Sequence, residues 1–159
     1  MSGFMIEIVT GAERLSTLVP EWRDLWTRAG ATPFQSPDWL VPWWDVFMPG
    51  ELRIVTVRNG DTLTGIAPLY REDASRGPRL LPLGISLSDY LDVIFDSDRI
   101  EESASRLAEA LKSMDDVAEC EFPELPPDAL ALRIPPPEGW DSNVFLASVC
   151  PVLSLPQRA

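Results

Sequence analysis

The stretch from Leu52 to Tyr70 reads LRIVTVRNGDTLTGIAPLY, and it carries the firmest local prediction of structure in the chain. Two runs rich in β-branched and apolar residues, Leu52 to Arg58 and Thr62 to Tyr70, flank Asn59-Gly60-Asp61. Asn-Gly tolerates the positive φ angles of a tight hairpin turn, and β-branched side chains fit a pleated surface. The sequence therefore predicts an antiparallel hairpin at the centre of the domain.

Helical patterns precede this hairpin. Phe4 to Val9 is typical of a β-strand, and after it apolar residues recur at helical spacing as far as Ala29. Pro20 lies inside that pattern and predicts a bent helix or two short ones, because proline cannot donate a backbone hydrogen bond. Ser36-Pro37-Asp38 is typical of a second helix start, with a capping hydroxyl, proline in the first turn and an acid near the positive end of the dipole.

A strand, a helix and a strand follow the hairpin. A polar loop is expected from Arg71 to Pro78, and then a short apolar run whose proline confines it to an edge or a strand end. Leu91 to Phe95, a helix from about Arg99 to Met114 capped by Asp98, and Val117 to Phe122 have the lengths of a right-handed parallel crossover. We therefore expect an α/β fold: a mixed sheet flanked by helices, with a central antiparallel hairpin and a βαβ crossover.

The C-terminal region is rich in proline. Six of the 16 prolines lie between Pro123 and Pro137, so this stretch is expected to be irregular, with at most a helical turn around Asp128 to Arg133. It leads to a last apolar, strand-like run from Val144 to Leu155. No internal repeat interrupts the pattern, and residues 1–159 are expected to form a single domain.

Composition excludes several classes of function. The 159 residues carry 25 acidic and 13 basic side chains, a net charge of -12, which disfavours nucleic acid and anionic membranes as partners. No apolar stretch is long enough to span a membrane and the start lacks signal-peptide features, so we expect a cytoplasmic protein. Histidine is absent, which removes Ser-His-Asp and Cys-His chemistry. Cys120 and Cys150 are expected to be small buried hydrophobes.

Tryptophan is concentrated in the two predicted helices. Five of the six tryptophans lie between Trp22 and Trp44. Exposed aromatic rings could stack on sugars or bases, but at helical spacing such residues more often form the core. We therefore expect a tryptophan-rich core under these helices.

The loop before Leu91 is the best candidate for recognition or chemistry. Ser88, Asp89, Tyr90 and Asp92 gather two carboxylates, a hydroxyl and a phenol where the chain turns between elements, and they are the predicted substrate-binding residues. Such residues also form turns by bonding their own backbone, and both interpretations stay open. Asp89 and Asp92 would face opposite sides of an extended chain, which disfavours a metal or an acid-base pair. No catalytic, cofactor-binding or metal-binding residue is predicted, and the glycine-rich nucleotide-binding loops are absent.

An ordered set of motifs resembles the bacterial CelD-type GNAT proteins. These motifs span most of the chain: Phe34 to Leu40 with Trp43-Trp44, Ala67 to Arg71, Leu81 to Gly84, Ser88 to Asp92, Phe122 to Asp128, and Ser148 to Pro151. The resemblance implies a GNAT-like fold in which this chain is the N-terminal half. In that family a second half holds the acetyltransferase signature and the acyl-CoA pocket, so acetyl-CoA is expected to bind there.

The resemblance also implies what the chain lacks and what it would bind. The Arg/Gln-x-x-Gly-x-Gly/Ala loop by which GNAT enzymes hold the pyrophosphate of CoA does not occur in it. Similar FemAB-type aminoacyltransferases place the acceptor near the cleft between halves, which by analogy gives Ser88, Asp89, Tyr90 and Asp92 an acceptor-side role. The expected partner is the missing C-terminal half, or a second copy bound through an exposed sheet edge.

Three functions are compatible with the sequence. The first is the acceptor-side half of an N-acyltransferase, silent alone, whose reading frame continues past Ala159. The second is a non-catalytic binding or scaffolding module that pairs with itself or another chain. The third is a small complete acetyltransferase with an unusual CoA loop.

Overall fold

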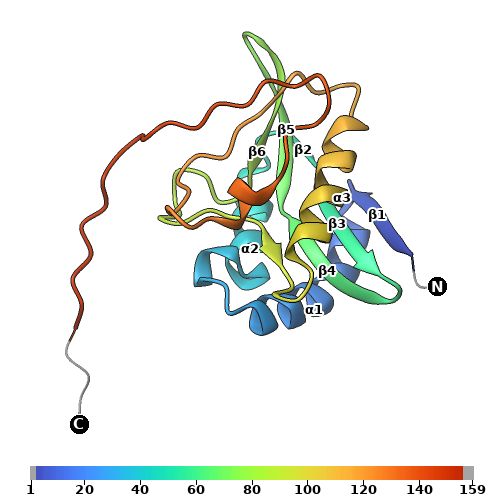
Figure 1. The fold of residues 1–159 in the computed structure, drawn as a ribbon, viewed down its shortest axis with the longest axis horizontal. Coiled ribbons are helices and arrows are strands. Elements are labelled where there is room, and N and C mark those ends of the chain that lie inside the picture. The colour runs from blue at the N-terminus through green and yellow to red at the C-terminus, as the bar shows by residue number, and fades with distance from the viewer. Residues whose placement is uncertain (1–2, 156–159) are drawn as a thin grey trace.

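A computed structural model describes residues 3–155, so the first two and last four residues of the predicted domain lie outside it. Within this range the chain forms two four-stranded sheets and three α-helices, a mixed α/β arrangement (Figure 1). In chain order the elements are β1 (Phe4–Val9), α1 (Ala12–Ala29), the 3₁₀ turn η1 (Pro33–Gln35), α2 (Pro37–Phe47), β2 (Glu51–Leu52), β3 (Ile54–Asn59), β4 (Thr62–Ala67), β5 (Leu69–Ala74), β6 (Gly77–Pro82), β7 (Ile94–Phe95), α3 (Ile100–Lys112), β8 (Glu119–Cys120) and the 3₁₀ turn η2 (Leu130–Arg133).

The predicted central hairpin is confirmed as β3 and β4. Asn59 pairs with Thr62, which leaves Gly60 and Asp61 as a two-residue loop. Gly60 has a φ of 60°, in the region where glycine carries no steric penalty. On its other side β3 pairs antiparallel with β1. The predicted first strand is thereby confirmed as well.

Two short interruptions divide the strands between two sheets. Pro68 separates β4 from β5, and Arg53 separates β2 from β3. One sheet has the order β1-β3-β4-β7, and the other has the order β2-β5-β6-β8. The backbone N–H of Arg53 donates to the carbonyl of Leu69 at 2.9 Å, so hydrogen bonding continues across both interruptions. The two sheets are therefore two parts of one long ribbon that is interrupted at Arg53 and Pro68.

The prediction of a polar loop from Arg71 to Pro78 is wrong. β5 and β6 pair as far as Ala74 and Gly77, with only Ser75 and Arg76 in the turn. This hairpin projects from the body, as Figure 1 shows, so its side chains need no apolar pattern. Arg79 instead bonds Glu72 across the two strands at 2.9 Å. Such cross-strand ion pairs suit a solvated ribbon.

The crossover has the predicted order of elements but different neighbours. β7 is only two residues long and pairs antiparallel with β4, while β8 pairs parallel with β6. The two strands joined by α3 therefore lie in different sheets. β7 and β8 are not paired with each other, unlike the two strands of the expected parallel crossover. α3 begins after Arg99, and Asp98 makes no side-chain cap, contrary to expectation.

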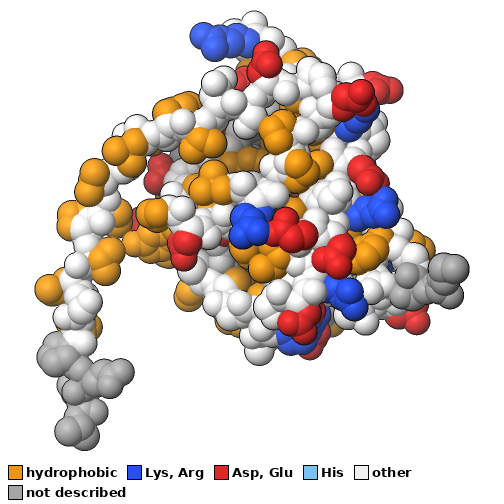
Figure 2. All heavy atoms as spheres, viewed as in Figure 1, with side chains coloured by type: hydrophobic (Ala, Val, Ile, Leu, Met, Phe, Trp, Pro, Cys, Tyr) orange, Lys and Arg blue, Asp and Glu red, His pale blue; other side chains and the backbone are white. Residues whose placement is uncertain are grey.

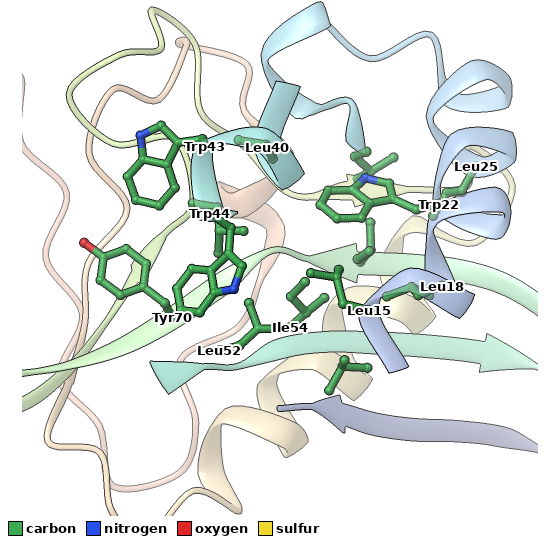
Figure 3. Close-up of a cluster of buried hydrophobic side chains, with 14 of the residues drawn as sticks. Leu15, Leu18, Trp22, Leu25, Leu40, Trp43, Trp44, Leu52, Ile54 and Tyr70 are labelled. Atoms are coloured by element: carbon green, nitrogen blue, oxygen red, sulfur yellow. The ribbon is translucent and has the colours of Figure 1, made fainter. Parts of the chain in front are cut away.

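Helices cover both faces of the ribbon and create two cores. The first core lies under α1 and α2, where the predicted tryptophan-rich packing is confirmed by Trp22, Trp43 and Trp44 (Figure 3). The second lies under α3, where Val55 and Val57 face the other way from Ile54. Alternate residues of the central strands thus supply opposite faces.

Helix α1 is continuous through Pro20, so of the two expectations for this proline the pair of short helices is wrong. Pro20 is exposed, and water can satisfy the carbonyl that its missing N–H leaves free. Leu15, Leu18 and Leu25 lie on the opposite, buried face of the helix. Burial of this face outweighs the cost of one lost hydrogen bond.

The C-terminal region is irregular, as expected. η2 confirms the short turn around Asp128 to Arg133, and it packs against α3. The run from Val144 to Leu155 forms no strand; it is an exposed, extended segment that leads away from the body (Figure 1). None of the helices in the described range is long and apolar enough to cross a membrane.

Candidate functional site

The loop between β6 and β7 is held by a turn at Gly84. Gly84 has a φ of 89°, and a Cβ atom there would lie 2.6 Å from Leu40 Cδ2 and 2.7 Å from Ser88 Oγ. The N–H of Leu87 donates back to the carbonyl of Gly84 at 3.2 Å. Only glycine fits this close approach, which presses the start of the loop against α2.

Ser88 anchors the loop to α2. Its side chain is buried, and its Oγ accepts a hydrogen bond of 3.0 Å from Trp39 Nε1. Phe34 packs edge-on against the Trp39 ring, with centroids 5.5 Å apart. These contacts fix the orientation of Trp39, whose ring stays 41% exposed. Ser88 thus acts in positioning an aromatic surface.

Asp92 anchors the other end of the loop. Its carboxylate accepts three backbone hydrogen bonds of 2.7 to 2.8 Å, from the N–H groups of Val93, Leu130 and Ala131. Burial raises the pKa of Asp92 above its ordinary value, while the three N–H donors oppose that shift. Asp92 therefore fixes the start of η2 against the loop.

Asp89 and Tyr90 lie between these two anchors. Asp89 is exposed. The Tyr90 hydroxyl lies 3.6 Å from Cys150 Sγ, and its ring is 6.4 Å from that of Phe34. The bond to the Cys150 thiol raises the pKa of Tyr90, and the charge of Asp89 adds to the shift. Of the four predicted residues, Ser88 and Asp92 hold the loop in place, Asp89 is exposed, and Tyr90 is half-buried with its hydroxyl beside Cys150.

Trp39 and Phe34 complete the surface beside Tyr90, and the prediction of site residues omitted both. The apolar stripe of α2 runs through Leu40, Trp43 and Trp44, and Trp39 lies off that stripe. A large aromatic residue outside the buried stripe was the available signal for an exposed ring.

The positive ends of the helices carry acidic side chains. The first turns contain Glu13 in α1, Asp38 in α2 and Glu101 with Glu102 in α3. These carboxylates offset the partial positive charge that would otherwise attract a phosphate. The hollow of about 240 Å³ beside the start of α3 is also lined by Asp96 and Asp98. Three of the four helix-start carboxylates are themselves paired with arginines: Asp38 with Arg23, Glu101 with Arg133, and Glu102 with Arg99, which also lines this hollow.

Neither of the two best-formed hollows lies at the loop. The larger, of about 330 Å³, is a surface depression over α3 lined by Phe4, Arg106 and three glutamates. Within residues 3–155 no group of three or more Cys, Asp or Glu side chains could hold a metal ion. Neither hollow is lined by a residue of the loop.

Of the two cysteines predicted to be buried, one is shielded and the other is exposed. Cys120 is largely shielded within β8, and burial raises the pKa of its thiol to about 12. Cys150, predicted to be buried, is exposed, because the segment that carries it does not pack into the body. Its neighbour in space is Tyr90.

Sequence and structure comparisons differ in what they detect. No family model matches this sequence, and no curated protein matches it. Two solved structures are nevertheless similar in fold. A GNAT family acetyltransferase from Staphylococcus aureus subsp. aureus USA300_TCH1516 matches with a TM-score of 0.54 and 9% identity, over 93% of this chain and 98% of that chain. A probable acetyltransferase matches with a TM-score of 0.55 and 15% identity, over 94% and 99% of the two chains.

Both matches extend over nearly the full length of the solved chains. They therefore lend no support to the CelD subtype or to the description of this chain as one half of a longer protein. At these identities the likeness concerns the fold and not the substrate. Together with the sheet order and the helices on both faces, it establishes that this chain has the GNAT acetyltransferase fold.

Proposed function

We propose that this chain is the acceptor-side domain of a GNAT-type N-acyltransferase, with acetyl-CoA bound by a separate half. The observation that carries the proposal is the loop from Ser88 to Asp92. Its two ends are fixed by Trp39 and by η2, and between them it exposes Asp89 and holds Tyr90 half-buried, with its hydroxyl beside Cys150. A fixed loop that exposes a carboxylate beside a half-buried phenol can orient an acceptor without reorganisation.

Charge also favours an acceptor site on this chain and an acetyl-CoA site on the other half. The chain has a net charge of -12, and its helix starts carry acidic side chains. The net negative charge opposes the binding of a polyanion such as CoA and favours an acceptor that carries an amine. The bond-forming step, attack of an acceptor nucleophile on the acyl thioester, would then take place between the two halves.

Titration with acetyl-CoA tests the donor side. We expect no rise in the melting temperature of this chain at millimolar acetyl-CoA, because a ligand stabilises only a folded state that binds it. A saturable rise would overturn the proposal and would indicate a small complete acetyltransferase. The proposal also requires the gene's reading frame to continue past Ala159 into an Arg/Gln-x-x-Gly-x-Gly/Ala loop, and a stop codon there would count against it.

Substitution in the loop tests the acceptor side. In the protein that contains both halves, Asp89→Asn and Tyr90→Phe should lower acetyl transfer while leaving the melting temperature unchanged. Trp140→Phe, in the irregular C-terminal region, provides an aromatic control that should change neither quantity. Lower stability with unchanged specific activity would show that the loop has a structural role only.

A second candidate is a non-catalytic module that pairs through a sheet edge. β1 is the outer strand of its sheet and exposes Met5 and Ile6. An unpaired edge with apolar side chains favours association with another strand. Light scattering measures the molar mass of the protein in solution. A molar mass that falls on dilution would support this function, provided that Ile6→Lys lowers it to the monomer value. A monomer at every concentration would exclude self-pairing.

A further inference from the structure

An apolar surface lies beside the candidate loop. It consists of Phe34, Trp39, Leu87 and Tyr90, which we call the aromatic ledge. Leu87 is 55% exposed and the Trp39 ring 41%. Ser88 and Phe34 fix the Trp39 ring, and Phe34 also contacts Tyr90. The ledge is thus formed in advance from three separate segments of the chain.

A second apolar feature is the C-terminal segment from 142 to 155. It contains no charged residue in a chain that is 24% charged. Seven large side chains of this segment are 77 to 85% exposed: Val144, Phe145, Leu146, Val149, Val152, Leu153 and Leu155. Figure 2 shows apolar side chains along the segment as it curves past the body. So many exposed apolar groups mark a binding segment.

One contact joins these two features. Tyr90 Oη on the ledge lies 3.6 Å from Cys150 Sγ in the segment. Cys150 stands between Val149 and Val152, so apolar side chains lie on both sides of the contact. From Cys150 to Leu155 an extended chain covers about 17 Å, enough to lie across a surface formed by four side chains. The contact shows where the segment meets the ledge.

We propose that residues 144–155 dock on the aromatic ledge of their own chain. The segment and the four side chains of the ledge carry no charge, so docking removes apolar surface from water. Once docked, the segment covers Tyr90 and limits access to the loop beside it. The proposal does not depend on acyl transfer.

The rate of Cys150 alkylation tests the docking. Iodoacetamide is added to the folded protein, and the peptide that contains Cys150 is quantified by mass spectrometry. The reference is a synthetic peptide of residues 142–155. A docked segment should react roughly tenfold more slowly than the peptide, because only its released form is accessible. The buried Cys120 thiol gives a separate peptide and does not interfere.

Two matched variants identify the surface that protects Cys150 from alkylation. Leu87→Asp introduces a charge on the ledge and should return the rate to that of the peptide. Met5→Asp makes the same change at a residue of equal exposure, 55%, on β1, and should leave the rate slow. Far-ultraviolet circular dichroism confirms that both variants are folded.

Three results would overturn the proposal. Cys150 could react as fast as the free peptide, which would mean that the segment is not docked. Leu87→Asp and Met5→Asp could have the same effect, which would place the docking surface elsewhere. Protection could increase with protein concentration, which would mean that the segment binds a second copy of the chain.

Discussion

At the scale of single residues, Asp92 and Asp89 provide a matched pair. Asp92 accepts three backbone N–H groups, whereas Asp89 is exposed. Asp92→Asn keeps one oxygen and places an amide N–H₂ at the other position. At Oδ2 it would leave the N–H of Leu130 without its partner, and at Oδ1 it would leave those of Val93 and Ala131 without theirs. We expect the free energy of unfolding in urea to fall by about 1–3 kcal/mol. Asp89→Asn should change it by less than about 0.5 kcal/mol. If Asp92→Asn and Asp89→Asn changed the free energy of unfolding equally, the bonds from Asp92 to η2 would not stabilise the fold.

Tyr70 should make stability depend on alkaline pH. It is buried and contacts the rings of Trp43 and Trp44, at 5.9 and 6.3 Å. Burial, assisted by the charge of Glu72, raises its pKa from 10.0 to about 12. Because the folded state holds this proton more tightly than the unfolded chain, the contribution is complete below pH 10 and is lost as pH rises toward 12.

The Tyr70→Phe variant tests this dependence. Denaturant unfolding between pH 9 and pH 11 should show a smaller loss of stability in the variant than in the natural chain. Absorbance of the tyrosinate ion near 295 nm measures the titration directly. An equally steep loss in the variant would assign the alkaline instability to other groups.

Sequence reasoning located the candidate loop but not what its residues contact. Ser88 meets Trp39, 49 residues away, and Asp92 meets Leu130 and Ala131, 38 and 39 residues away. A local pattern of hydroxyls and carboxylates contains no information about partners so distant in the chain. The distinction between anchoring residues and the other residues of the loop therefore emerged only from the fold.

At the scale of elements, the turn at Gly84 should tolerate no larger residue. Gly84→Ala combines a positive φ with a clash against Leu40 and Ser88. We expect a loss of about 2 kcal/mol in unfolding free energy and a weaker hold on the loop. Gly3→Ala, where a Cβ meets no atom within 4 Å, is the control and should be neutral. A neutral Gly84→Ala would mean that the loop can shift away from α2 at little cost.

Elements were predictable where the signal is local. The hairpin of β3 and β4 follows from Asn59-Gly60 between β-branched runs, and α2 follows from its Ser36-Pro37 start, with Ser36 accepting from the N–H of Trp39. The hairpin of β5 and β6 was missed, because its solvated strands carry charges on both sides. Periodicity reports burial, and the outer parts of these strands, Arg71 to Ala74 and Gly77 to Arg79, contain no buried residue.

At the scale of the whole molecule, the two cores should unfold together. They lie on opposite faces of one ribbon, and the central strands contribute to both. Five of the six tryptophans lie in or beside α1 and α2, so tryptophan fluorescence reports mainly on the first core. We expect its urea transition to coincide with that of far-ultraviolet circular dichroism. Separate midpoints would show that the α3 face unfolds independently.

The α/β class and the GNAT-like architecture followed from the order of elements, and the likeness to solved structures confirms them. The division into two sheets could not be predicted. A single proline within an apolar run does not show that the strands before and after it pair with different partners. The exposed C-terminal segment was also missed, because an apolar run looks the same whether or not a partner surface covers it.

The two tight hairpins have a consequence for the kinetics of folding. β3 with β4, and β5 with β6, each close over two residues, whereas β8 must find β6 across about forty residues of chain. Short closures cost the least entropy and form first. We expect the ribbon to assemble early, with β8 and α3 joining it late. Substitutions in the hairpins should then mainly slow refolding, and substitutions around β8 should mainly accelerate unfolding.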